Sequence, residues 1–304
     1  PKEFLTNLET LGYTKLTAIQ EKSLPLSLDN KDLIAQAKTG SGKTVSFCIP
    51  ILNKINIKNF RIQSLILAPT RELANQIAQE LRKLSRHIHN LKVLTLCGGT
   101  PFKPQVLSLS HGAHIIVATP GRVLKHIQQN NIDLENITTL VLDEADKMLD
   151  LGFEIELEEL LKSLPKNRQN LLFSATYPQK MLNIASKITT DAIEVFIEDE
   201  TQTVQTINQR VIAVNKENRS PLLRNLIQNH SWEQILVFMA NKRSCDNIAA
   251  KFRKYGLNAE SFHGDLVQDE RNETLEDFKD KKIKILFATD IAARGIDIDD
   301  LKYV

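Results

Sequence analysis

The sequence has few cysteines, few aromatic side chains and no long apolar run. Only three of its 304 residues are cysteine, and Cys48, Cys97 and Cys245 are far apart along the chain. Three scattered thiols are too few for a disulfide framework or a zinc site, which fits a reducing compartment. No apolar run approaches the roughly 18 residues that a membrane helix needs, and we expect no signal peptide. These absences favour a cytoplasmic protein that makes no use of a membrane.

Charge of neither sign dominates. The chain has 39 Lys and Arg against 37 Asp and Glu, a formal net charge of +2. A dedicated nucleic-acid module is usually strongly basic, so composition alone does not indicate a nucleic-acid partner. Hydrophobic residues are 42% and charged residues 25%, which is typical of a globular protein and excludes disorder and collagen-like repeats. His111 and His114 have no further ligand candidates nearby, so they do not indicate a metal site.

Short, continuously apolar runs alternate with helical stretches such as 71–85 and 154–164. Continuous apolarity is typical of a parallel strand that is buried on both faces. The predicted strands of the first series are 32–37, 64–68, 91–96, 114–118, 139–142 and 171–175. Those of the second series are 210–214, 235–239, 258–262, 283–288 and 301–304. The sequence therefore predicts an α/β fold with two domains, 1–197 and 207–304, and a polar linker at 198–206.

A phosphate-binding loop is predicted between the first strand and the helical stretch 45–54. Residues 37–44 read Ala-Lys-Thr-Gly-Ser-Gly-Lys-Thr, which fits the P-loop pattern except that Ala37 replaces its first glycine. Glycines let backbone N–H groups turn toward phosphate oxygens, and the helix N-terminus adds its positive dipole end. We expect Lys43 to reach the β- and γ-phosphates and Thr44 to hold Mg²⁺. The alternative is an ordinary surface turn before a helix.

Two carboxylates follow the apolar run 139–142. Asp143 stands where a Walker B aspartate holds Mg²⁺, and Glu144 is placed to act as the base that orients the attacking water. The alternative is an acidic N-cap of the following helix. The phosphate loop about a hundred residues upstream favours the catalytic interpretation.

Together these residues resemble the motifs of the DEAD-box RNA helicases, a family of superfamily 2, and further segments agree in order. The matching segments are Pro69–Ala74 (PTRELA), Gly98-Gly99 with Gln105, Thr119–Arg122 (TPGR), Asp143–Asp146 (DEAD), Ser174–Thr176 (SAT), Val237-Phe238, Gln268–Arg271 (QxxR) and Ala288–Asp297. The resemblance covers the whole chain. It implies two RecA-like parallel-sheet domains joined by a short linker, the second truncated at its C-terminus.

For the nucleotide, the resemblance implies an ATP–Mg²⁺ site. Its catalytic residues are Lys43, Asp143 and Glu144, and Mg²⁺ is held through Thr44 and Asp143. The implied ATP-binding residues are Gln20, Thr39, Gly40, Ser41, Gly42, Lys43, Thr44 and Asp297. Gln20 resembles the glutamine that reads the adenine edge, which needs both a donor and an acceptor. Tyr13 either lies near the adenine or only packs against its own helix, and Leu16 and Ala18 stand where the family often has proline.

For RNA, the resemblance implies contacts to the backbone of a single strand or short duplex with little sequence preference. The implied contact residues are Thr70, Arg71, Gly99, Thr119, Arg122, Gly264, Gln268, Arg271 and Thr289. Contacts to 2′-hydroxyl groups would select RNA over DNA. Ser174 and Thr176 resemble the segment that couples the state of ATP to the grip on RNA.

The implied activity is an ATP-dependent RNA helicase, active as a monomer, that locally unwinds short duplexes or remodels RNA–protein complexes. The sequence leaves three alternatives open. One is a DNA translocase of the same superfamily. Another is an RNA clamp that uses ATP to lock on and unwinds little. The third is a trimmed chain that is inactive although its parent works.

The resemblance also generates a first prediction. The family's motif VI, whose arginines contact the γ-phosphate, is expected directly after Val304 and is therefore outside these 304 residues. Because an arginine that contacts the γ-phosphate in this way accelerates hydrolysis roughly 10³–10⁵-fold, we expect the 304 residues to bind nucleotide but hydrolyse it poorly. Robust RNA-stimulated ATP turnover by this chain alone would contradict that expectation.

Overall fold

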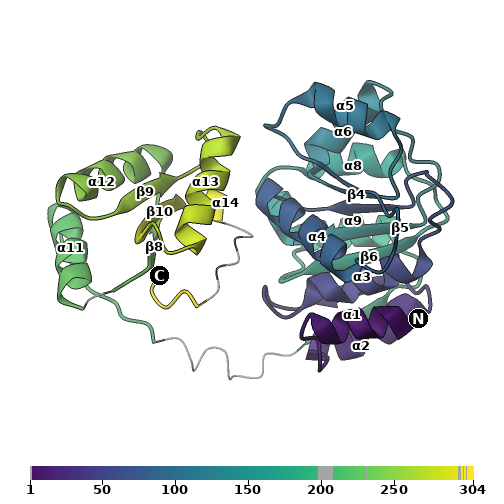
Figure 1. Ribbon diagram of the computed structural model, residues 1–304, viewed down its shortest axis with the longest axis horizontal. Helices are drawn as coiled ribbons and strands as arrows, with labels where there is room; N and C mark the ends of the chain where they lie inside the picture. Colours follow the sequence, from purple (N-terminus) through teal and green to yellow (C-terminus); the bar gives the residue numbers. More distant parts are fainter. Residues whose placement is uncertain (1, 198–207, 231, 294–295, 297, 299) are drawn as a thin grey trace. The chain divides into compact units, whose positions relative to one another are not determined.

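The chain forms two compact units, Pro1–Asp199 and Glu200–Val304, in a computed structural model (Figure 1). The structure describes residues 2–197, 208–230, 232–293, 296, 298 and 300–304. The predicted linker 198–206 lies outside the described residues, and the predicted domain boundaries stay predictions. No helix within the described residues is both long enough and apolar enough to cross a membrane.

A seven-stranded sheet forms the centre of the first unit, and all its neighbouring strands are parallel. In spatial order the strands are β3 (Val93–Leu96), β4 (Ile115–Ala118), β2 (Ser64–Leu67), β5 (Thr139–Asp143), β6 (Gln169–Ser174), β1 (Leu33–Gln36) and β7 (Ile193–Phe196). Because the strands are parallel, the loops that follow them all emerge at one edge of the sheet. The loops after β1, β5 and β6 are therefore neighbours, as are those after β2, β3 and β4.

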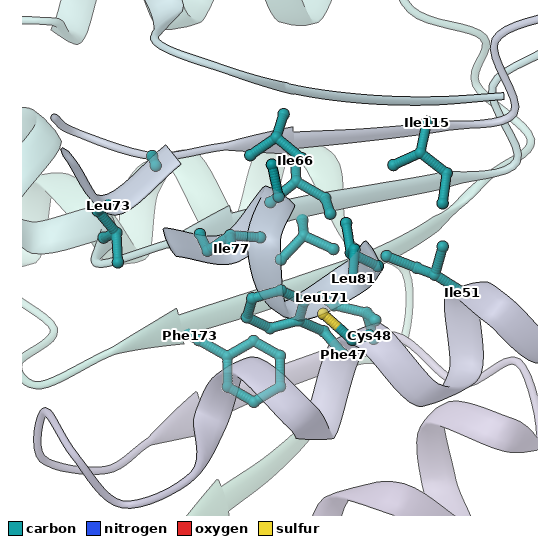
Figure 2. Packing of buried hydrophobic residues seen from close by; sticks show 14 of the residues in the cluster. Phe47, Cys48, Ile51, Ile66, Leu73, Ile77, Leu81, Ile115, Leu171 and Phe173 are labelled. Atoms are coloured by element: carbon teal, nitrogen blue, oxygen red, sulfur yellow. The ribbon is translucent and has the colours of Figure 1, made fainter. Parts of the chain in front are cut away.

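Helices cover both faces of this sheet, which explains the continuous apolarity of its strands. They are α1 (Lys2–Thr10), α2 (Ala18–Leu28), α3 (Lys43–Lys54), α4 (Arg71–Leu84), α5 (Phe102–Ser110), α6 (Pro120–Gln128), α7 (Ala145–Asp150), α8 (Glu154–Lys162) and α9 (Gln179–Ile188). Along β2, Ile66 joins the core beneath α3 and α4, whereas Leu65 and Leu67 join the core beneath α6 to α9. Figure 2 shows the first of these cores, in which Phe47 of α3 packs near Phe173 of β6.

The second unit has a smaller parallel sheet with the strand order β8 (Ile235–Met239), β10 (Ile285–Thr289) and β9 (Ala259–Phe262). Its helical segments are η1 (Lys216–Asn218), α11 (Arg219–Asn229), α12 (Lys242–Lys254), α13 (Gln268–Lys279) and α14 (Asp290–Ala293). Two apolar clusters lie on opposite faces of this sheet, one against α12 and the other against α13. The prediction of an α/β fold with parallel sheets is confirmed.

Two predicted strands were wrong, and one observed strand was not predicted. Residues 210–214 form no strand, and Val211 is 99% exposed, because an apolar run without a neighbouring strand to pair with gains no ladder hydrogen bonds. Residues 301–304 contribute only a single bridge between Tyr303 and Ile235. Conversely, β7 was missed because it is a short edge strand on which only Val195 is buried. The other predicted strands are present with ends shifted by at most two residues, and 235–239 coincides with β8.

The packing around Phe173 generates a second prediction. Its ring is fully buried, and its centroid lies 5.4 Å from that of Phe47. Replacing it in Phe173→Ala leaves a cavity and should lower the free energy of unfolding by about 3–5 kcal/mol, measured by urea denaturation. The matched control is Phe196→Ala on β7, whose side chain is 47% exposed and should cost about 1 kcal/mol or less. Equal losses in the two variants would show that the core is misassigned.

Candidate functional site

The loop between β1 and α3 has the geometry of an anion-binding loop. Gly40 and Gly42 have positive φ values of 81° and 93°, and Gly42 is the N-cap of α3. A Cβ on Gly42 would lie 2.6 Å from Nε2 of Gln20, so no larger residue fits there without displacing that amide. The loop therefore turns sharply into the N-terminus of a twelve-residue helix, where backbone N–H groups and the helix dipole favour an anion.

Lys43 is the buried cation of this loop. Its side chain is 6% exposed, and Nζ donates a 2.7 Å hydrogen bond to the carbonyl of Ala37 across the loop. Its charge also acts on Asp143 and Glu144, because it lowers the pKa of each carboxyl. An ammonium group that lies at the loop and acts on two carboxylates is suited to donate charge-assisted hydrogen bonds to phosphate oxygens.

Asp143 and Glu144 lie at the carboxyl end of β5, and both are almost fully buried. Burial raises the pKa of the Asp143 carboxyl to about 7, against the lowering effect of Lys43, and burial also raises the pKa of Glu144. Glu144 has a left-handed backbone with φ of 50°, which is unusual for a residue other than glycine. Its Oε1 accepts a 3.3 Å hydrogen bond from Oγ1 of Thr39, which holds the carboxylate toward the phosphate loop.

Asp146 connects the acidic segment to the end of the neighbouring strand β6. Its Oδ2 accepts hydrogen bonds from the backbone N–H of Thr176 at 3.1 Å and from the Thr176 hydroxyl at 2.8 Å. The Ser174 hydroxyl accepts a hydrogen bond from the N–H of Asp146 at 3.1 Å, and the Ser174 carbonyl accepts one from the N–H of Ala37. Ser174 thus touches both the phosphate loop and the acidic segment. The sequence analysis assigned no role to Asp146, although its spacing from Asp143 was visible.

Gln20 lies beside the phosphate loop. Its Oε1 accepts from the N–H of Thr17 at 2.9 Å, and its Nε2 donates to the carbonyl of Gly42 at 3.2 Å. The amide therefore fixes the start of α2 against the start of α3. Tyr13, whose role the sequence left open, donates from its hydroxyl to Glu80 of α4 at 2.5 Å and packs against the core, so the structure supports the packing alternative.

The residues at this edge fit a magnesium ion. No group of three or more His, Cys, Asp or Glu side chains that could hold a metal occurs among the described residues. Mg²⁺ needs no such cage, because it is commonly held by one or two carboxylates together with substrate phosphates and water. The carboxyl of Asp143, whose pKa is raised by burial that Lys43 only partly offsets, and the half-buried Thr44 suit that role.

A second group of residues lies after β2, β3 and β4 on the same edge of the sheet. Thr70 and Thr119 are the N-caps of α4 and α6, and their hydroxyls accept hydrogen bonds from the N–H groups of Leu73 and Gly98. Gly99 has φ of 73°, and a Cβ there would lie only 2.0 Å from Nη1 of Arg71. The guanidinium of Arg71 therefore lies directly against this turn.

Arg122 completes this second group. It donates through Nη2 to the carbonyl of Thr100 at 3.1 Å, and its pKa is lowered by burial and by the nearby charge of Arg71. Two guanidinium groups and two helix N-termini thus converge after these strands. This concentration of positive potential suits the phosphates of an extended anion.

The candidate residues of the second unit also gather after neighbouring parallel strands. Gly264 follows β9, with no atom within 4 Å of an ideal Cβ, and Thr289 ends β10. Gln268 and Arg271 lie in the first turn of α13, and the guanidinium carbon of Arg271 lies 5.1 Å from the ring centroid of Phe262. Asp297 lies outside the described residues.

A phosphate loop and a buried acidic strand end, side by side on a parallel sheet, define a nucleoside-triphosphate-binding protein of the P-loop type. The sequence agrees with that class: residues 17–184 match the family model of the DEAD/DEAH box helicases, and residues 218–304 match the helicase conserved C-terminal domain. The chain belongs to the DEAD/DEAH box helicase family, as its motifs indicated.

Relatives and solved structures agree with this assignment. The chain is 44% identical to the ATP-dependent RNA helicase DbpA of Escherichia coli (strain K12), over 100% of this chain and 66% of DbpA. It is 41% identical to the DEAD-box ATP-dependent RNA helicase CshA of Geobacillus kaustophilus, over 100% of this chain and 65% of CshA. The chain thus spans about two thirds of the length of these relatives.

Among solved structures, the crystal structure of a DEAD box protein from Methanococcus jannaschii is 40% identical with a TM-score of 0.62, covering 98% of this chain and 80% of that one. S. cerevisiae Dbp5 bound to RNA and ADP BeF3 is 29% identical with a TM-score of 0.86, covering 99% of this chain and 77% of that one. These likenesses support the expected pair of RecA-like domains.

The buried carboxyl of Asp143 generates a third prediction. Its pKa is raised from 3.8 to about 7, so between these values the folded chain binds more protons than the unfolded chain. The free energy of unfolding therefore falls as the pH rises through this window. Asp143→Asn should match the wild type near pH 4 and be more stable above pH 7. The limit is about 4 kcal/mol at 1.36 kcal/mol per pKa unit.

Urea denaturation at pH 4.5 and pH 8 measures this difference. The matched control is Glu135→Gln, because Glu135 is exposed and precedes β5, whereas Asp143 lies at the opposite end of that strand. A stability advantage of Asp143→Asn that is the same at both pH values would contradict the prediction.

Proposed function

We propose that this chain is the ATPase and RNA-binding part of an ATP-dependent RNA helicase. One observation carries the proposal: the two groups of candidate residues lie on the same edge of one parallel sheet, and Asp146, Ser174 and Thr176 join its central strands there. DbpA and CshA are named ATP-dependent RNA helicases, and the Dbp5 structure is bound to RNA and ADP BeF3, which supports the assignment.

The nucleotide is proposed to bind along the loop 37–44. Its phosphates would accept from the backbone N–H groups at the start of α3, and Lys43 would exchange its bond to the carbonyl of Ala37 for phosphate oxygens. Gln20, placed at Gly42, would offer its amide to the adenine edge. Mg²⁺, held through Thr44 and Asp143, supplies neutralisation of the charge that develops during phosphoryl transfer. Asp297 is proposed as a further contact from the second unit.

Glu144 is proposed to orient the attacking water and take its proton. Burial raises the pKa of its carboxyl, which makes it a better base than an exposed glutamate, and the charge of Lys43 opposes part of that rise. The hydrogen bond from Thr39 ties the position of this base to the phosphate loop. Thr39 thus links the conformation of the loop to the carboxylate that acts on the water.

RNA is proposed to bind through its sugar–phosphate backbone to the second group of residues. Arg71 and Arg122 would bind phosphates, while the N-termini of α4 and α6 add positive potential. Gly264, Gln268, Arg271 and Thr289 are proposed as the contacts from the second unit. Because none of these groups reads base edges, little sequence preference is expected. The bonds of Asp146 to Ser174 and Thr176 tie the acidic strand end to the segment after β6.

A fourth prediction tests this function. In the full-length protein that carries this chain, ATP hydrolysis should rise on addition of single-stranded RNA and not on addition of single-stranded DNA. Glu144→Gln removes the base and should lower the RNA-stimulated rate by about 10²–10⁴-fold while the protein still binds ATP. The matched control is Glu159→Gln on the exposed side of α8, which should hydrolyse ATP at the wild-type rate.

The other outcomes decide among the alternatives. Equal or greater stimulation by DNA would assign the protein to the DNA translocases, and no stimulation by either polymer would withdraw the proposed RNA contacts. Stimulation by RNA without separation of a short duplex would favour the RNA clamp. The monomeric state and the cytoplasmic location stay predictions.

A further inference from the structure

The side-chain amide of Gln105 connects three segments of the first unit. Gln105 lies on α5, 9% exposed, and its Nε2 donates to the carbonyl of Cys97 at 3.1 Å and to Oγ1 of Thr100 at 2.6 Å. Its Oε1 accepts from Nη1 of Arg122 at 3.4 Å and from Nε2 of His126 at 3.1 Å. One amide thus links the glycine turn after β3 to two residues of α6.

Arg122 and His126 fix the direction in which this amide points. A guanidinium can only donate, so the bond from Arg122 to Oε1 places the oxygen of Gln105 toward α6 and the amide nitrogen toward Cys97 and Thr100. The side chain of His126 is fully buried, and no partner for its Nδ1 occurs among the described residues. Burial lowers the pKa of His126 to about 4, and the neutral ring donates from Nε2 to the same oxygen.

Phe102 closes the other side of this cluster. Its ring is stacked on His126 with centroids 4.3 Å apart and an angle of 15° between the planes. The guanidinium carbon of Arg122 lies 5.5 Å from the centroid of Phe102, within range of a cation–π interaction. Arg122 is therefore held by the amide of Gln105, the carbonyl of Thr100 and an aromatic face.

The same cluster fixes the shape of the glycine turn. Thr100 also donates from Oγ1 to the carbonyl of Cys97 at 2.9 Å, so both ends of the turn that contains Gly99 are tied to one another and to Gln105. Because Gly99 lies against the guanidinium of Arg71, a change in this turn would move Arg71 as well. Three of the proposed RNA contacts thus depend on one buried amide.

We propose that Gln105 is a positioning residue for RNA: its amide presets Arg122 and the Gly98-Gly99 turn in the arrangement that binds the RNA backbone. This inference rests on the proposed function. A preset donor loses less conformational entropy on binding than a free arginine side chain, so the amide raises affinity without touching the ligand.

The test is the affinity of the full-length protein for a fluorescein-labelled single-stranded RNA with ADP BeF3 present, measured by fluorescence anisotropy. Gln105→Met keeps the length of the side chain and removes all four hydrogen bonds. It should weaken RNA binding about tenfold, the effect of losing one hydrogen bond to a charged group. The matched control, Gln128→Met, changes an exposed residue at the end of α6 and should bind RNA as the wild type does.

A double-mutant cycle separates positioning from general destabilisation. If Gln105 acts through Arg122, combining Gln105→Met with Arg122→Ala should weaken binding by less than the product of the two single effects. The RNA concentration that half-saturates ATPase stimulation should rise, while the rate at saturating RNA stays at the wild-type value. A merely structural defect would lower that rate, and its effect on RNA affinity would multiply with the effect of Arg122→Ala.

Each remaining outcome is decisive. Unchanged affinity in Gln105→Met, or effects that multiply, would overturn the inference while the proposed function stands. A wild-type protein that does not bind RNA would instead remove the proposed function. If Gln105→Met does not fold, Thr100→Val takes its place in the cycle, because it removes one acceptor of the amide at a half-buried position. The same coupling to Arg122, at about threefold weaker binding, is then expected.

Discussion

Parallel pairing of β5, β6 and β1 is the constraint on which the rest of the structure depends. Because three neighbouring strands end at the same edge, the phosphate loop, the buried acidic strand end and the Ser174–Thr176 segment become neighbours, although the loop precedes the other two by about a hundred residues or more. The apolar faces beneath α3 and α4 on one side and α6 to α9 on the other keep the strands in this register. The site is a consequence of strand order.

Burial of charge gives the site its chemical character. Asp143 and Glu144 are almost completely covered, and burial raises the pKa of both carboxyls although Lys43 opposes it. Such an arrangement destabilises the folded chain above the pKa of Asp143, and a bound cation with phosphate would relieve that cost. Asp146 is also buried, and Thr176 donates two hydrogen bonds to its Oδ2. Stability is thus lower where the chemistry is expected.

The sequence predicted most strands from their continuous apolarity. β2 is buried at all four positions, as its apolar run indicated, and β8 coincides with the run 235–239 although Phe238 is 48% exposed. The run 210–214 failed because apolarity does not supply a neighbouring strand, and β7 was missed because an edge strand needs few buried residues. The phosphate loop and acidic strand end were recognisable since their chemistry demands fixed residue types at short spacing.

The sequence by itself determined the parallel α/β fold, the phosphate loop and the carboxylates that follow β5, because each depends on residues close together in the chain. Only the tertiary structure decided that Gln20 holds Gly42, that Tyr13 packs against Glu80 and that one amide, Gln105, joins the turn after β3 to α6. These contacts connect residues on different elements. Their geometry depends on strand order and helix packing, which no local pattern encodes.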